Sequence, residues 1–357
     1  PKRLLRVFSF SYSHWIDNMV LPNNRHTSSA EEHLAEQYKL VAMPVKNPLA
    51  AGIDVGDSSH WVCIDSTPDK PDSVREFPAH TRGLQELSAW LKEHQITTVA
   101  LEASGVYGHV LFLQLIEDGF EVVMTGPHFT RQIKGRPKTD KRDCQWIQRL
   151  HSLGFLPSIF QPDEPTQTLR DLVRQRANHV RLCAQHVQRM QKALQLMNLK
   201  LTHVLGDITG VTGLKIIRSI INGERDPVEL AKLRDRRCKH DEAEIAEALT
   251  GRYRSEHVLE LELCYTMWQH YQAVITKLDG VIDAHLKTMQ RHDLPPLPKK
   301  ARVRGRKPHD PKFDVRTALY FLLGLDLTAI EGIDEIHALT LISELGTDFS
   351  KWPTVQH

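Results

Sequence analysis

The chain has 357 residues, of which 41% are hydrophobic and 25% are charged, and its formal net charge is +2. This is the composition of an ordinary soluble protein with room for two or three domains. Five scattered cysteines without a CxxC spacing exclude a disulfide scaffold or a cysteine-rich zinc site, and no apolar stretch reaches the roughly 20 residues that span a bilayer. We therefore expect a cytoplasmic protein that has no membrane partner.

The first segment, residues 1–46, shows no sustained hydrophobic periodicity. The chain does not begin with methionine, and Met43 lies just before the first expected strand. We interpret residues 1–46 as an N-terminal extension that is non-native or disordered, with Met43 as the native start. The alternative is a genuine, ordered N-terminal arm.

Residues 48–153 are expected to form an α/β domain. The apolar runs and turn residues predict, in order, strands at 50–55, 60–65 and 74–78, a helix at 82–94, a strand at 97–101, a helix at 106–118, a strand at 120–124 and a helix at 140–152. Three leading strands followed by alternating helices and strands indicate a mixed sheet flanked by helices. This is the outline of a ribonuclease H-like, or RuvC-like, domain.

Four carboxylates lie at the ends of these expected elements. Asp54 lies near the end of the first strand, in Gly-Ile-Asp-Val-Gly, and Glu102 closes Thr-Val-Ala-Leu-Glu. Asp140 and Asp143 open a helix in Lys-Thr-Asp-Lys-Arg-Asp, and their spacing of three puts them on one helical face. If the four converge, they suit two hard divalent cations such as Mg²⁺, which promote in-line attack on a phosphodiester.

Each carboxylate also has a purely structural explanation. Asp140 is the kind of acid that the helix dipole favours in the first turn of a helix. If Asp140 has only that capping role, Asp143 is the least certain of the four ligands. Glu102 suits a loop at the end of a strand. Asp54 is the hardest to explain structurally, because a lone carboxylate among apolar residues is costly to bury.

The near-neutral net charge conceals two strongly basic segments. Between Arg131 and Arg142 six Lys or Arg residues accompany one acid, and six of the nine residues from Lys299 to Lys307 are basic. Such segments near carboxylates favour a polyanionic partner, whereas the alternative is a solvated charged surface. The candidate nucleic-acid contacts are Arg131, Lys134, Arg136, Lys138, Lys141, Arg142, Lys299, Lys300, Arg302, Arg304, Arg306 and Lys307.

Residues 160–292 are expected to be helical. One heptad seam runs from Leu169 to Leu201 and is interrupted by Arg176, and a second runs from Leu261 to Met289. The shorter, Gly- and Pro-broken helices of 207–250 lie between them. This pattern predicts an antiparallel coiled-coil hairpin with a compact insert, through which the chain dimerises or tetramerises. The alternative is two amphipathic helices of one globular bundle. We expect His285, which lies in the second seam, to be a core or interface residue and not a ligand.

The last part of the chain is expected to hold a linker and a hairpin. Residues 293–316 form a Pro-rich, basic linker, and residues 317–357 read as the start of a C-terminal domain. Two short helices around Gly332 are similar to a helix-hairpin-helix, whose backbone N–H groups bind phosphate. A plain helical hairpin has the same pattern.

The three acidic motifs in this order carry a family resemblance. Gly-Ile-Asp-Val-Gly followed by His60, then Leu-Glu-Ala-Ser-Gly-Val-Tyr-Gly, then Lys-Thr-Asp-Lys-Arg-Asp resemble the DEDD transposases of insertion sequences, of the bridge-RNA-guided IS110 type. The resemblance covers roughly residues 48–357. It implies a RuvC-like fold with Mg²⁺ bound by Asp54, Glu102, Asp140 and Asp143. It also implies recombination of DNA at element ends and a target chosen by a guide RNA.

In that family a C-terminal domain supplies a serine nucleophile, and we expect this serine to lie beyond residue 357. Two other classes stay open. Actin-like ATPases and sugar kinases also open with Gly-Ile-Asp-Xaa-Gly, but their later phosphate and adenosine motifs are not found here. A non-catalytic coiled-coil scaffold that binds nucleic acid is the other alternative.

Overall fold

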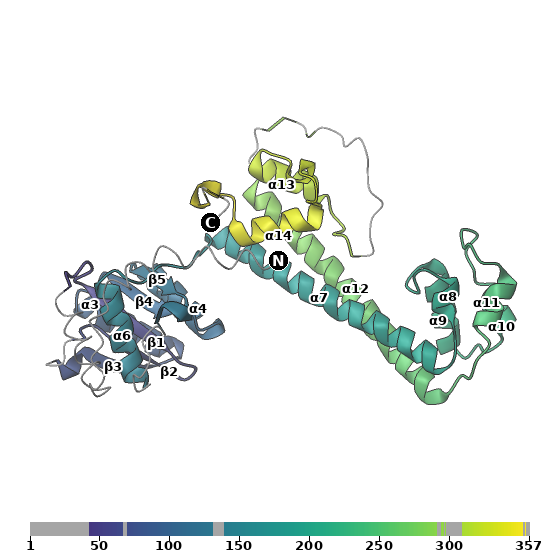
Figure 1. Ribbon diagram of the computed structural model, residues 1–357, viewed down its shortest axis with the longest axis horizontal. Helices are drawn as coiled ribbons and strands as arrows, with labels where there is room; N and C mark the ends of the chain where they lie inside the picture. The colour runs from purple at the N-terminus through teal and green to yellow at the C-terminus, as the bar shows by residue number, and fades with distance from the viewer. Residues whose placement is uncertain are drawn as a thin grey trace, which may run out of the picture. The chain divides into compact units, whose positions relative to one another are not determined.

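The chain divides into two compact units, one up to Phe160 and one from Gln161 onward. The computed structural model describes residues 43–66, 70–130, 139–290, 294–295, 297, 309–352 and 354 (Figure 1). The predicted extension therefore lies outside the described residues up to position 42. Within the described residues, no helix is long and apolar enough to cross a membrane.

The first unit is built on one five-stranded sheet. Its strands are β1 (Ala50–Val55), β2 (Ser59–Cys63), β3 (Val74–Pro78), β4 (Thr98–Glu102) and β5 (Glu121–Thr125), in the spatial order β3-β2-β1-β4-β5. β1, β2 and β3 pair antiparallel, whereas β4 lies parallel to β1 and β5 lies parallel to β4. Its helices are α3 (Thr81–Glu93), α4 (Val106–Glu117), α5 (Pro127–Thr130) and α6 (Asp140–Ser152), with a 3₁₀ turn, η2 (Pro71–Ser73). The mixed sheet agrees with the expected ribonuclease H-like fold, and the predicted elements are confirmed within one or two residues.

The two faces of this sheet bury different helices. On one face Ile53 and Leu101 contribute to the main core together with residues of α3 and α4. On the other face Ala100 forms a smaller cluster with Ile147 and Leu150 of α6. Because side chains alternate along a strand, neighbouring residues of β1 and β4 point to opposite helices.

Gly52 sets how closely α6 approaches the sheet. A methyl group added there would lie 2.1 Å from the backbone nitrogen of Gln148 and 2.6 Å from the carbonyl oxygen of Cys144. The backbone of α6 therefore lies directly on β1, and the Gln148 amide donates to the carbonyl oxygen of Ala50 at 3.1 Å. Only glycine fits this approach.

The second unit is helical. Two long helices, α7 (Glu164–Leu196) and α12 (Ser255–Met289), lie side by side (Figure 1). They are antiparallel, because the start of α7 shares a cluster with the end of α12, and the end of α7 shares another with the start of α12. Between them in sequence are α8 (Leu201–Val204), α9 (Val211–Ile221), α10 (Pro227–Ala231) and α11 (Glu242–Ala248), which close the second of these clusters.

The C-terminal elements pack on the other end of the helix pair. They are α13 (Val315–Leu323), η3 (Leu327–Ala329), α14 (Glu335–Leu345) and η4 (Phe349–Lys351). Residues of α13 and α14 share one hydrophobic cluster with Leu169 and Val173 of α7 and with Ile282 and Leu286 of α12. In the described residues, α7 and α12 form the antiparallel pair of long helices that the two seams predict. A coiled coil between subunits is not confirmed.

Arg176, the predicted interruption of the first seam, is a buried partner of α12. Its Nε lies 2.5 Å from Oδ1 of Asp279, and the two side chains are 7% and 2% exposed. The guanidinium also donates to the carbonyl oxygen of His309, and the other oxygen of Asp279 accepts from the backbone of Lys312. The Arg176–Asp279 ion pair therefore links both long helices to the segment that precedes α13.

Candidate metal and nucleic-acid site

Asp54 and Glu102 lie at the carboxyl ends of adjacent parallel strands. Ile53 of β1 is in register with Leu101 of β4, and both belong to the core under α3 and α4. The next residues, Asp54 and Glu102, therefore point to the opposite face, which α6 covers. The sheet thus brings two of the four predicted carboxylates to one end and one face.

α6 brings the other two carboxylates toward the same end. Gln148 reaches Ala50, and Cys144 lies against Gly52, so α6 runs antiparallel to β1. The start of α6, with Asp140 and Asp143 in its first turn, therefore lies toward the carboxyl end of β1. Thr139 caps this start, since its hydroxyl accepts from the backbone N–H of Arg142.

The environment of Cys144 supports this placement. Hydrogen bonding to Cys63 and burial raise the pKa of the Cys144 thiol, and the charge of the nearby Asp54 raises it further. The thiol therefore stays neutral beneath the acidic end of the sheet. Asp54, Glu102 and Asp143 are half-buried, whereas Asp140 is exposed.

Glu102 is held by a residue that the sequence did not point to. The hydroxyl of Thr130, at the end of α5, donates to Oε2 of Glu102 at 2.6 Å and also lies 3.0 Å from the carbonyl oxygen of Pro127. The indole N–H of Trp146 in α6 donates to the carbonyl oxygen of Thr130 at 3.0 Å. No motif marks Thr130, because its role depends on a contact 28 residues away in sequence.

The chemistry of the four side chains fits a hard divalent cation. All are oxygen donors that carry negative charge, as Mg²⁺ prefers. In the described residues, no three Asp, Glu, His or Cys side chains form a ready-made metal group. Like charges repel, so a cation that binds here must draw the side chains together.

The basic residues predicted to contact nucleic acid are only partly described. Lys141 and Arg142 are exposed in the first turn of α6, beside Asp140 and Asp143. The other predicted contacts of the two basic segments, namely Arg131, Lys134, Arg136, Lys138, Lys299, Lys300, Arg302, Arg304, Arg306 and Lys307, lie outside the described residues.

Gly332 lies in the second unit, in a turn with φ of 87°. Only the single 3₁₀ turn η3 stands between α13 and this glycine, and α14 begins three residues after it. The carboxylate of Asp334 accepts from the backbone N–H groups of Ile336 and His337, which a phosphate would otherwise use. A helix-hairpin-helix is therefore not confirmed.

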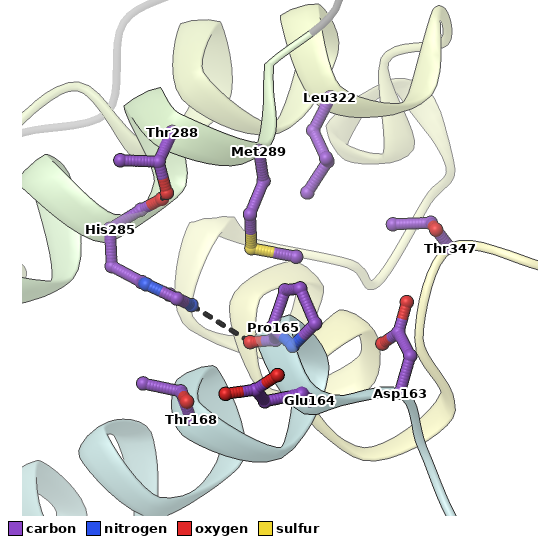
Figure 2. A pocket seen from close by; sticks show the side chains of 9 residues that line it. All are labelled: Asp163, Glu164, Pro165, Thr168, His285, Thr288, Met289, Leu322 and Thr347. Carbon is purple, nitrogen blue, oxygen red and sulfur yellow. Dashed lines mark hydrogen bonds between the residues drawn. The ribbon is translucent and has the colours of Figure 1, made fainter.

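A separate pocket of about 500 Å³ lies in the second unit, between the start of α7 and the end of α12. Figure 2 shows His285 at its wall, with the ring Nε2 2.8 Å from the carbonyl oxygen of Pro165. This bond ties the two long helices together, so His285 has the structural role that we expected. The pocket contains none of the four predicted carboxylates.

Comparison with known proteins supports the motif analysis. A family model for the DEDD transposases of IS110 type, described as "Transposase", matches residues 51–199. A protein of Sinorhizobium fredii named "Putative transposase y4qE" is 32% identical over 88 residues, which cover 24% of this chain. The match spans about a quarter of that relative, 23% of its length. The resemblance to the DEDD transposases of IS110 type is therefore confirmed over residues 51–199, the segment that carries all four carboxylates.

Proposed function

We propose that this protein is a DNA transposase, or recombinase, of an insertion sequence, and that Asp54, Glu102, Asp140 and Asp143 bind Mg²⁺ for chemistry on DNA phosphodiesters. The observation that carries the proposal is the arrangement of these residues. They come from β1, β4 and α6, are separated by up to 89 positions (54 to 143), and lie toward one end and one face of the sheet. A structural role does not require acids on three elements to lie toward the same end of the sheet.

The residues have distinct tasks in this proposal. The carboxylates hold the cations, which when bound stabilise negative charge on the scissile phosphate. Lys141 and Arg142 are exposed beside the acids and hold the DNA backbone without reading its sequence. Gly52 keeps α6 close to β1, so that Asp140 and Asp143 remain near Asp54.

The partners follow from the family resemblance. We propose DNA at the element ends and at the target as substrates, a guide RNA that selects the target by base pairing, and assembly as a homodimer or tetramer. Two bound Mg²⁺ ions agree with four carboxylates, because each ion is commonly bound through one or two of them.

Iron-mediated cleavage of the polypeptide tests the metal site without depending on activity. Fe²⁺ that replaces Mg²⁺, with ascorbate and peroxide, generates radicals that cut the backbone nearby. We expect cuts near residues 54, 102 and 140, suppressed by excess Mg²⁺ and by Asp54→Asn or Glu102→Gln. The matched control is Glu121→Gln, an exposed acid at the opposite end of β5, which should keep the pattern. Cuts that Asp54→Asn leaves unchanged would rule out this site.

A recombination assay tests the activity. The plasmid carries the coding sequence with its natural flanking DNA, so that element ends and any guide RNA are supplied together. We expect Mg²⁺-dependent excision or joining products that Asp54→Asn abolishes and Glu121→Gln preserves. Full activity of folded Asp54→Asn would refute the proposal. ATP binding abolished by Asp54→Asn would instead favour the actin-like class.

A further inference from the structure

Thr130 occupies a position between the two halves of the candidate site. It lies at the end of α5, between the strand β5 and the helix α6. Its hydroxyl contacts Glu102 from β4, and its carbonyl oxygen accepts from Trp146 of α6. One residue is thus bonded both to a predicted metal ligand and to the helix that carries two others.

We infer that Thr130 is a positioning residue that orients the carboxylate of Glu102 for a divalent cation. This inference rests on the proposed function and deepens it. At 2.6 Å the hydroxyl makes a short bond to Oε2, as expected for a charge-assisted contact. The hydroxyl has one hydrogen, which faces Oε2 of Glu102 at 2.6 Å and the carbonyl oxygen of Pro127 at 3.0 Å, and the shorter contact orients the carboxylate.

The geometry around Thr130 restricts its hydroxyl. Pro127 lies at the start of α5, and its carbonyl oxygen lies 3.0 Å from the same hydroxyl. The indole N–H of Trp146, a half-buried residue of α6, holds the backbone of Thr130 by donating to its carbonyl oxygen at 3.0 Å. Both contacts reduce the rotation of Thr130, so Glu102 loses less freedom when it binds a cation.

Outer-shell partners of metal ligands commonly account for about 10- to 100-fold in metal affinity or activity. We expect Thr130→Val, which keeps the shape and removes the donor, to weaken cation binding about tenfold. Thr130→Ser keeps the hydroxyl and should restore most of the affinity. Trp146→Phe removes the donor to the Thr130 backbone and should have a smaller effect in the same direction.

Thr125 provides a matched control for the valine substitution. It is buried on β5, in register with Glu102, and its hydroxyl has no hydrogen-bond partner among the residues that the structure describes. Thr125→Val therefore makes the same chemical change nearby without removing a bond. This variant should bind the cation as the wild type does.

The experiment titrates the full chain with Mn²⁺ alone and follows free Mn²⁺ by electron paramagnetic resonance. Circular dichroism confirms that each variant is folded. Wild-type binding that is lost in Asp54→Asn, weakened about tenfold in Thr130→Val and restored in Thr130→Ser would support the inference. Affinities of Thr130→Val and the wild type within twofold of each other would overturn the inference alone. Absence of Asp54-dependent binding in the wild type would overturn the proposed metal site, and the inference with it. If Thr130→Val does not fold, the other two variants decide. Wild-type affinity in Trp146→Phe, together with weakened binding in Thr130→Ser, would overturn the inference. In that case binding would be weakened where the hydroxyl is kept and unchanged where a hydrogen bond to Thr130 is removed.

Discussion

Substitution of Gly52 by alanine tests the contact that brings α6 onto the sheet. The added methyl carbon would lie 2.1 Å from the backbone nitrogen of Gln148 and 2.6 Å from the carbonyl oxygen of Cys144. An added Cβ makes ordinary contact with a heavy atom at 3.4–4 Å, so α6 must move by roughly 1 Å. Neither contact can be relieved by a side-chain rotation, because both atoms belong to the backbone. We expect a loss of about 1–3 kcal/mol in the free energy of unfolding, or more if the helix cannot move.

The same displacement would reach the candidate site. Asp140 and Asp143 move with α6, whereas Asp54 stays with the sheet. A misplacement of about 1 Å at a catalytic site can cost on the order of 100-fold in rate. Gly52→Ala should therefore impair cation binding and recombination more than its loss of stability alone predicts, because a variant that remains mostly folded would still have a displaced helix.

Urea unfolding gives the change in stability, and hydrogen exchange within β1 and α6 assigns it to the first unit. The matched control is Gly280→Ala on the exposed side of α12, where no atom lies within 4 Å of the added carbon. That change should stabilise the chain by about 0.5–1 kcal/mol, because alanine favours helix more than glycine does. A neutral surface substitution changes the free energy of unfolding by roughly 0.5 kcal/mol or less. If the free energy of unfolding of Gly52→Ala differs from that of the wild type by no more than this, the close packing of α6 on β1 is refuted.

Two further predictions concern buried polar groups. Arg176→Met should lower the free energy of unfolding of the second unit by about 3–5 kcal/mol, because it leaves the buried Asp279 without the guanidinium. Adding Asp279→Leu should restore most of that free energy, as measured by urea unfolding. Equal stability of the single and double variants would contradict this. His151 is buried against the hydroxyl of Thr98, and burial lowers its pKa to about 4, so below pH 6.5 the unfolded chain takes up a proton that the folded chain does not. The difference in the free energy of unfolding between the wild type and His151→Gln, measured by urea unfolding, should therefore favour the wild type most above pH 6.5. It should fall by up to about 3 kcal/mol as the pH approaches 4. A difference that does not change with pH over this range would show that His151 is not held neutral.

Much of the local structure of this protein is determined by its sequence. Short apolar runs closed by glycine or acidic residues located β1 and β4, and the acids at their ends marked the candidate site. The heptad seams located α7 and α12 for a similar reason. In both cases the signal is a repeat between neighbouring residues, which depends on the geometry of one strand or one helix and not on the rest of the fold.

Only the tertiary structure decided which of these residues meet. Arg176 interrupts the apolar seam of its helix, and only the fold supplies its partner Asp279. Thr130 belongs to no sequence motif, and only the fold brings its hydroxyl to Glu102. Gly52 is one glycine of nineteen in the sequence, and its requirement comes from the backbone of α6 above it. Hydrogen bonds, ion pairs and steric contacts act through space over a few ångströms. Residues far apart in sequence therefore acquire partners only when the chain has folded.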